Sequence, residues 1–218
     1  MKKQIKLTAW ILTVFLLLTA CQAFAENAET SAEELNSYGI MQGDPDGSFR
    51  LEDNVTRAEA AALVYRLYRA NDDSVATVSA AFPDMVGHWA AAEVAFAKAA
   101  GLVDGTSETT FSPDEPVTLQ EFLKMTVTLL GYQNQAERQA GYPIGYGIIA
   151  TNLGLTKGIS APMDMPLTRG MVANILVNAL DVPLIVVTES GEEIVYVVMD
   201  GKNEVPMQTL RIALENKN

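Results

Sequence analysis

The chain has 218 residues, of which 49% are hydrophobic, enough for one domain with a real core or for several small stacked units. It holds 27 acidic and 15 basic residues, a net charge of −12, and such an acidic surface repels phosphate backbones, so we expect no nucleic-acid partner. A single histidine and a single cysteine nearly exclude Ser-His-Asp, Cys-His and multi-histidine metal sites, and we assign no catalytic residue, metal or cofactor.

Residues 1–25 have the pattern of a secretory signal peptide. Three lysines precede an apolar run over residues 9–18, which is shorter than the about 20 apolar residues of a membrane-spanning helix. Cleavage after Ala25 fits the small-x-small rule of ordinary signal peptidase, and we favour it. It would remove the three lysines and leave 12 basic against 27 acidic residues, a net charge of −15.

A second cleavage site competes with the first. Leu18-Thr19-Ala20-Cys21 resembles the lipobox of bacterial lipoproteins, in which Cys21 becomes the lipid-carrying first residue. Membrane attachment is expected only in that case. After cleavage at Ala25 no cysteine remains, so neither a disulfide nor thiol chemistry is available.

The rest of the chain repeats. A shift of 62 residues places Gly39 on Gly101 and Phe49 on Phe111, and the matches continue without a gap into the following helix. We expect a first unit over residues 26–70 and a second over residues 80–132. Each is predicted to fold as a helix, a glycine-marked loop and a second helix.

In the first unit, a short helix is predicted near Ser31 and a longer one from Thr56. The Thr56 hydroxyl and the Glu59 carboxylate have the spacing of a capping box. Behind them Ala60, Leu63, Val64 and Leu67 follow helical spacing and predict the buried stripe. The loop sequence Asp44-Pro45-Asp46-Gly47 lacks the glycine and the acid that an EF-hand needs further on, so we interpret it as a turn.

In the second unit, an alanine-rich stretch from Trp89 to Ala100 predicts a helix that ends at Gly101. A capping box of Thr118 and Glu121 opens the next helix. Trp89 at a helix start is more often a core residue than a binding platform, and core packing is the safer interpretation.

A third, diverged unit is expected over residues 140–181. Gly154 and Gly158 repeat the glycine spacing, and Leu167-Thr168-Arg169 repeats the start of the second helix, after a deletion of three residues. Thr168 is again the predicted cap, but Gly170-Met171 replaces the residues that would complete the box.

Residues 182–218 change in character. Two runs rich in β-branched residues, 184–188 and 194–199, flank Glu189-Ser190-Gly191-Glu192 and predict a β-hairpin. Residues 209–213 are expected as a third short strand. So few strands are marginal alone, so they should dock on the helices or begin a further domain.

The motifs in these units resemble the S-layer homology family, whose units open with Phe-x-Asp and His-Trp-Ala, pass an Asp-Gly-x-Phe loop and close on Ile-Thr-Arg-Ala-Glu. The residues that match are Phe82-Pro83-Asp84, His88-Trp89-Ala90, Asp46-Gly47-Ser48-Phe49 and Val55-Thr56-Arg57-Ala58-Glu59. The match covers roughly residues 30–181, and the combined spacing is specific.

This chain also departs from the family pattern. The first unit lacks the Phe-x-Asp and His-Trp-Ala opening. The second has Leu119-Gln120 where the family has Arg-Ala, and the third has Tyr142 where the Trp belongs. These changes put binding at the second and third units in doubt.

The resemblance implies three helix-loop-helix repeats around a pseudo-threefold axis, and the whole chain is therefore expected to be mainly α, with the β-hairpin tail predicted above after the repeats. It implies an exported, non-catalytic protein of the cell wall or cell surface that binds a secondary cell-wall polymer or a peptidoglycan-linked glycan, often through a pyruvylated amino sugar. The residues expected to contact it are Arg57, Trp89, Asp84, Arg169, Gly43 and Gly105.

Structural interpretations of these residues stay open. Arg57 and Arg169 follow helix caps, where a cation meets the positive end of the helix dipole, and either a ligand or an inter-repeat salt bridge would explain them. Asp84 is expected to cap its helix or turn. The alternative functions are an envelope scaffold that binds no glycan and a wall hydrolase that lacks its catalytic domain, since a pair of carboxylates is not excluded by composition.

Overall fold

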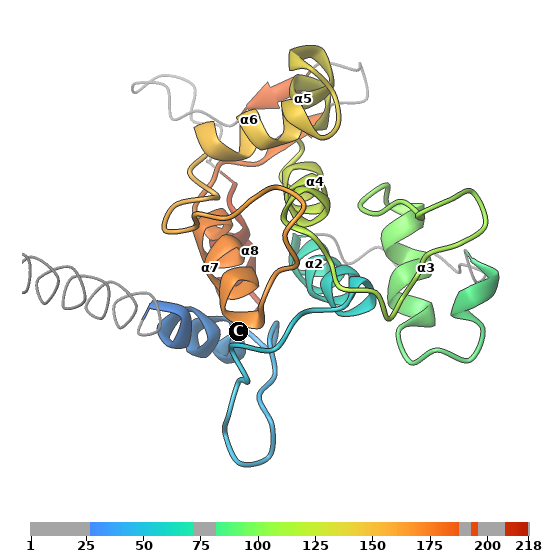
Figure 1. Cartoon of the computed structure of the whole chain (residues 1–218). Coiled ribbons are helices and arrows are strands. Elements are labelled where there is room, and N and C mark those ends of the chain that lie inside the picture. The colour runs from blue at the N-terminus through green and yellow to red at the C-terminus, as the bar shows by residue number, and fades with distance from the viewer. Residues whose placement is uncertain (1–26, 72–81, 188–192, 196–207, 218) are drawn as a thin grey trace, which may run out of the picture.

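The computed structural model describes residues 27–71, 82–187, 193–195 and 208–217 (Figure 1). The expected signal peptide and Cys21 lie outside these residues. The fold is mainly α, as predicted. Its helical elements are residues 27–37, α2 (Arg57–Asn71), the 3-10 turn η1 (Pro83–Met85), α3 (Ala91–Ala99), α4 (Leu119–Leu129), α5 (Gln133–Gln139), α6 (Ile144–Asn152), α7 (Arg169–Leu180) and α8 (Leu210–Glu215).

Helices α2, α4 and α7 each begin directly after a threonine. Before α2, the Glu59 N–H donates to the Thr56 hydroxyl at 3.2 Å and the Thr56 N–H donates to the Glu59 carboxylate at 2.8 Å. Before α4, the Thr118 N–H donates to Glu121 at 2.9 Å. Before α7, the Met171 N–H donates to the Thr168 hydroxyl at 3.4 Å. These bonds satisfy N–H groups that a helix start leaves without intrahelical partners.

The extended segments before these helices form a closed ring. The Val55 N–H donates to the Leu167 carbonyl, the Leu167 N–H to the Val117 carbonyl, and the Val117 N–H to the Val55 carbonyl, each at 2.9 Å. All three side chains are fully buried. Because the ring closes on itself, it holds the starts of α2, α4 and α7 together.

The first N–H groups of these helices also have partners. At α2, Arg57 and Ala58 donate to the carbonyls of Glu115 and Pro113. The corresponding bonds join α4 to Met165 and Met163, and α7 to Asp53 and Leu51. Each helix start is therefore docked on a loop from another part of the chain, and its first donors are not available to a ligand.

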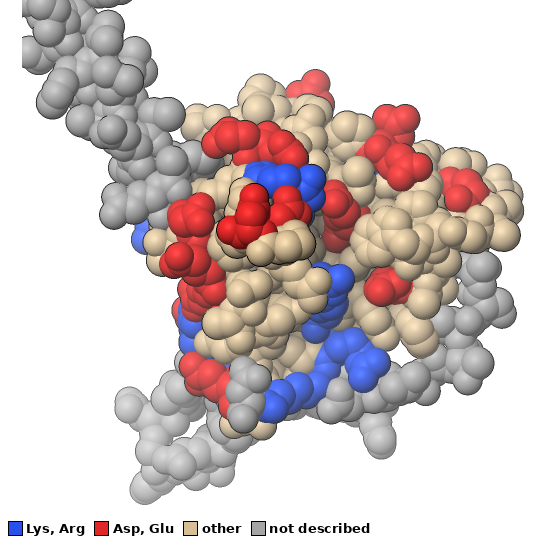
Figure 2. All heavy atoms as spheres, turned by 90° about the horizontal axis from the view of Figure 1, so that it is seen from below, with Lys and Arg blue, Asp and Glu red and all other residues tan. Residues whose placement is uncertain are grey.

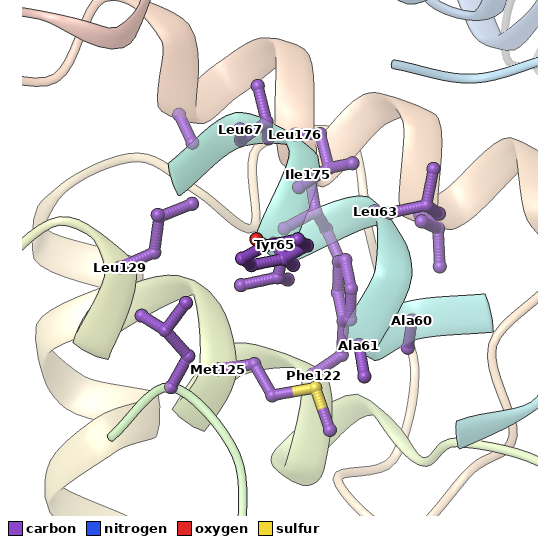
Figure 3. Packing of buried hydrophobic residues seen from close by; sticks show 14 of the residues in the cluster. Ala60, Ala61, Leu63, Tyr65, Leu67, Phe122, Met125, Leu129, Ile175 and Leu176 are labelled. Atoms are coloured by element: carbon purple, nitrogen blue, oxygen red, sulfur yellow. The ribbon is translucent and has the colours of Figure 1, made fainter. Parts of the chain in front are cut away.

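The core lies where α2, α4 and α7 meet (Figure 3). Leu63 and Leu67 of α2, Phe122 of α4 and Ile175 of α7 lie there, and each is at most 5% exposed. The buried stripe predicted for α2 is confirmed, since Ala60 and Val64 are fully buried as well. Burial of this kind stabilises a domain by about 25 cal/mol per Å² of apolar surface.

The remaining helices cover this centre. α3 packs on α2, α5 and α6 pack on each other and on α4, and α8 packs on α2 and α7. Within the described residues, no helix is long and apolar enough to cross a membrane.

The tail differs in part from the expectation. Strands β1 (Ile185–Val187) and β2 (Glu193–Val195) pair antiparallel, with Ile185 opposite Val195, while the rest of the predicted hairpin lies outside the described residues. The predicted strand over residues 209–213 is wrong. Those residues begin α8, because the Thr209 hydroxyl accepts the Ile212 N–H at 3.2 Å and caps a helix.

Candidate functional site

Two grooves lie beside the loops that precede α2 and α4. Groove 1, of about 140 Å³, is lined by Met41, Gln42, Glu59, Ala62, Leu63, Arg66, Trp89 and Arg169. Groove 2, of about 110 Å³, is lined by Arg57, Leu102, Val103, Asp104, Gly105, Glu121, Lys124, Met125 and Tyr142. Most residues that line groove 1 fall on residues that line groove 2 when the sequence is shifted by 62 positions. The two grooves are therefore built from equivalent positions of the sequence repeat.

An arginine that lines each groove binds the adjoining loop in the same way. Arg57 donates from Nε to the Phe111 carbonyl at 2.9 Å and from Nη2 to the Asp104 carbonyl at 3.0 Å. Arg169 donates from Nε to the Phe49 carbonyl at 2.7 Å and from Nη2 to the Gln42 carbonyl at 2.9 Å. The same shift relates the two pairs of acceptors, so each arginine clamps the equivalent loop of a different unit.

The two arginines differ in their remaining partners. Arg57 is only 4% exposed, pairs through Nη1 with Glu121 at 2.6 Å, and lies 4.9 Å from the centre of the Phe111 ring. The inter-repeat salt bridge that was one interpretation of Arg57 is therefore present. Arg169 is half-buried, and within the described part of the chain no carboxylate lies in salt-bridge range of it.

A lysine further distinguishes groove 2. Lys124 donates to the Asp104 carboxylate at 2.7 Å, and Lys98 donates to the other oxygen of that carboxylate at 2.7 Å. The Lys124 ammonium also lies 5.2 Å from the centre of the Tyr142 ring. These two hydrogen bonds lower the pKa of Asp104, although its partial burial opposes the shift. At the position equivalent to Lys124, groove 1 has Ala62.

Each groove has an aromatic side chain on its rim. Trp89 of groove 1 is 59% exposed and Tyr142 of groove 2 is 44% exposed. The interpretation of Trp89 as a core residue is therefore wrong: Ala90, its neighbour, is fully buried instead. The His88 ring lies 5.5 Å from the Trp89 ring, and its Nδ1 accepts the Ala90 N–H at 3.2 Å, which orients this helix start.

The comparison with known families agrees with the repeat. The S-layer homology domain family matches residues 25–61 and 81–123, the stretches that contain the glycine loops and helix starts of both grooves. The chain carries S-layer homology domains.

Relatives with similar sequences carry the names of cell-surface, cell-wall and anchoring proteins. The chain is 40% identical over 91 residues, 41% of its length, to cell surface glycoprotein 1 of Acetivibrio thermocellus. It is 36% identical over 93 residues, 42% of its length, to a cellulosome-anchoring protein of that bacterium. It is 28% identical over 184 residues, 84% of its length, to the middle cell wall protein of Brevibacillus brevis. The matches span only 4%, 21% and 16% of these relatives.

Asp84, in the opening motif of the second S-layer homology domain, has a role that differs from the predicted cap. Its carboxylate accepts the Phe111 N–H at 2.9 Å and the Ser112 N–H at 2.8 Å, so it ties the opening to the loop of groove 2. Burial alone would raise the pKa of Asp84, but these backbone bonds and the nearby Arg57 outweigh it and lower the pKa. Asp84 does not line either groove.

The two glycines expected at the ligand serve the packing of their loops. A Cβ atom on Gly105 would lie 2.4 Å from the Ser107 carbonyl oxygen, and one on Gly43 would lie 3.1 Å from the Ser48 carbonyl oxygen. Gly105 also lines groove 2, whereas Gly43 lies beside groove 1 and does not line it. In the same loop, the Gly47 N–H donates to the Asp44 carbonyl, in the turn predicted for that segment.

The sequence reasoning missed three side chains of these domains. Lys124, Arg66 and Gln42 line the grooves but belong to no quoted motif. A shift of 62 residues sets Lys124 opposite Ala62 and Arg66 opposite Thr128, so both positions differ between the two units. Such a difference alone does not indicate a groove, because an arginine or lysine on a helix is ordinarily exposed.

Proposed function

We propose that the protein is a non-catalytic anchoring module of the cell surface, and that groove 1 holds an acidic sugar of a cell-wall polymer. The observation that carries the proposal is the exposed Trp89 ring in one groove with Arg169 and Arg66. The names of the relatives, a cellulosome-anchoring protein and a middle cell wall protein among them, support a wall-anchoring role.

The side chains of groove 1 suit a carboxylated sugar. A flat apolar ring offers a surface on which a sugar face can lie, and a guanidinium presents paired donors that match a carboxylate. Arg169 uses Nε and Nη2 to bind carbonyls, which leaves its charge uncompensated by the described carboxylates. A pyruvyl ketal on an amino sugar is one such carboxylate.

Groove 2 fits this role less well. Its two cations, Arg57 and Lys124, are paired with Glu121 and Asp104, so a carboxylate entering the groove would compete with internal partners. We therefore propose that Arg169 and Trp89 contact the ligand, and that Arg57 holds two repeat units together.

The architecture that we propose for the chain is three repeats around a pseudo-threefold axis. The ring of hydrogen bonds between Val55, Leu167 and Val117 supports it, since each segment donates to one neighbour and accepts from the other. In this arrangement groove 1 receives its loop, its tryptophan and its arginine from three different units. Loss of one unit would then dismantle the groove.

A wall pull-down tests the proposal. The mature protein is mixed with purified walls of the producing bacterium, either untreated or treated with hydrofluoric acid, which removes the secondary polymer. Binding to untreated walls only, and its loss in Trp89→Ala but not in the matched variant Tyr142→Ala, is expected. Equal binding to both wall preparations, or none, would favour the alternative of a structural scaffold without glycan binding.

A further inference from the structure

A larger cavity of about 330 Å³ adjoins groove 1 and is named here the α8 cavity. Its walls include Tyr38, Arg66 and Arg69, together with Leu214 of α8 and Lys217, which follows that helix. The volume falls within the about 300–1,000 Å³ of small-molecule sites. Arg66 lines both spaces, so the α8 cavity and groove 1 share one arginine side chain.

The positive side chains that line the two spaces lie next to one another in the structure. Arg169 donates to the Gln42 carbonyl at 2.9 Å, and Arg66 donates to the Ile40 carbonyl at 2.8 Å, so both guanidinium groups sit against one short segment. Arg69 comes about one helical turn after Arg66 on α2, hence on the same face.

The last cation of the series comes from the end of the chain. Lys217 donates from its ammonium group to the carbonyl of Arg69, which fixes it at the C-terminal end of α2. Positive side chains thus extend from the Trp89 groove to the end of α8.

The charge of this region contrasts with that of the whole molecule. The protein has 27 acidic and 15 basic residues, yet among the residues that the structure describes four cations line these two spaces, against the two acids Glu59 and Glu93. The Glu59 carboxylate already accepts the Thr56 N–H. Figure 2, which views the molecule from below, shows a group of Lys and Arg side chains in the lower part of that face, while most of the Asp and Glu side chains lie elsewhere on it, with some basic side chains among them.

We propose that groove 1 and the α8 cavity form one continuous track for an acidic glycan chain. Groove 1 binds the terminal acidic sugar. The α8 cavity binds the anionic group, a carboxylate or a phosphodiester, of a sugar residue further along the same glycan. The proposal rests on the proposed function of groove 1. It adds that the protein recognises more than one sugar residue of the glycan. It also adds that α8, which lies outside the residues that match the family, contributes to this binding.

The test is calorimetric titration with two fragments of the polymer from the producing bacterium. One fragment carries a single terminal acidic sugar, and the other carries three acidic units. The longer fragment is expected to bind about tenfold more tightly, with a steeper loss of affinity in salt, because it meets additional cations. Circular dichroism confirms that each variant is folded.

Three variants distinguish one continuous track from two independent binding sites. Lys217→Gln is expected to remove about two thirds of the affinity for the longer fragment and to leave that for the shorter one unchanged. Arg66→Gln should weaken both fragments, since Arg66 lines both spaces. Lys157→Gln, an exposed cation elsewhere, is the matched control and should change neither.

Each contrary result has a distinct meaning. Equal affinity for the two fragments, or an unchanged affinity of Lys217→Gln for the longer one, overturns the track while groove 1 stands. Absence of binding by both fragments overturns the proposed function and the track together. A shorter fragment that binds the parent protein and loses affinity in Lys217→Gln would place the terminal sugar in the α8 cavity and refute the assignment.

Discussion

Grooves 1 and 2 occupy equivalent positions of two repeats, yet their polar groups have different partners. In groove 2, Arg57 is bound by Glu121 and Lys124 is bound by Asp104. In groove 1, Arg169 has only carbonyl partners among the described residues, and Ala62 leaves space where a lysine stands in groove 2. A shared framework can therefore hold one open site and one site whose charges are satisfied internally.

The largest expected effect is on stability and concerns the groove 2 arginine. Arg57→Ala removes a buried cation and leaves Glu121 and two loop carbonyls without their partner, which should lower the free energy of unfolding by about 3 kcal/mol. Arg169→Ala, at a more exposed site with no carboxylate partner among the described residues, should cost about 1 kcal/mol. Urea denaturation of both variants measures the difference. Equal losses would remove the contrast between the two arginines.

The next effect concerns binding. Trp89→Ala should weaken binding of the wall polymer by about 2 kcal/mol, roughly thirtyfold, because the central apolar contact of groove 1 is lost. Tyr142→Ala, the equivalent change in groove 2, should leave the affinity within about twofold. Calorimetric titration compares them, and a larger loss for Tyr142→Ala would reverse our assignment of the two grooves.

A third change should make the grooves more alike. Lys124→Ala removes the ammonium group that lies beside Asp104 and Tyr142, and gives groove 2 the alanine that groove 1 has. The titration is still expected to show one site per chain, because Arg57 stays paired with Glu121 and Asp104 loses one of its two lysine partners, so the opened space offers no cation to an acidic sugar. A second binding event would show that free space, rather than an available cation, decides which groove binds.

The smallest effect depends on pH. Because the pKa of Asp84 is lowered in the folded protein, its carboxylate contributes stability that is present above pH about 4, its usual pKa, and is lost as pH falls below that. Asp84→Asn should therefore make the free energy of unfolding fall less steeply between about pH 5 and 3. Wall binding by groove 1 should be unchanged in the variant at pH 7. If the free energy of unfolding fell equally steeply with pH in Asp84→Asn and in the parent protein, the charge of Asp84 would not be what holds the Phe111 loop.

The sequence alone was sufficient for the local features of the fold. Thr56 and Glu59 have the residue types and spacing of a capping box, and helical spacing placed Leu63 and Leu67 in the core, where the structure has them. Such features depend on neighbours three or four residues away, so one sequence contains all the information that they need.

The partners of the polar side chains depend on contacts between distant parts of the chain. Nothing near Arg57 in sequence indicates that it pairs with Glu121, or that Asp84 binds the Phe111 loop. Trp89 was expected in the core because tryptophan is usually buried, but Ala90 turns inward at this helix start instead.

The error at the tail was avoidable. Thr209 and Ile212 are β-branched and favour a strand, yet Leu210, Ala213 and Leu214 have helical spacing behind a threonine cap. Capping competes with strand propensity in so short a segment. The packing of α8 on α2 and α7 further stabilises the helix in this segment.

The central claim is that groove 1 holds the wall polymer, and the fluorescence of Trp89 tests it most directly. The chain has two tryptophans, Trp10 and Trp89, and cleavage after Ala25 would leave Trp89 as the sole reporter. Titration with the polymer should shift or quench its emission, with the same dissociation constant that calorimetry gives, since the half-exposed ring becomes covered. Calorimetric binding that leaves the Trp89 emission unchanged would contradict the claim.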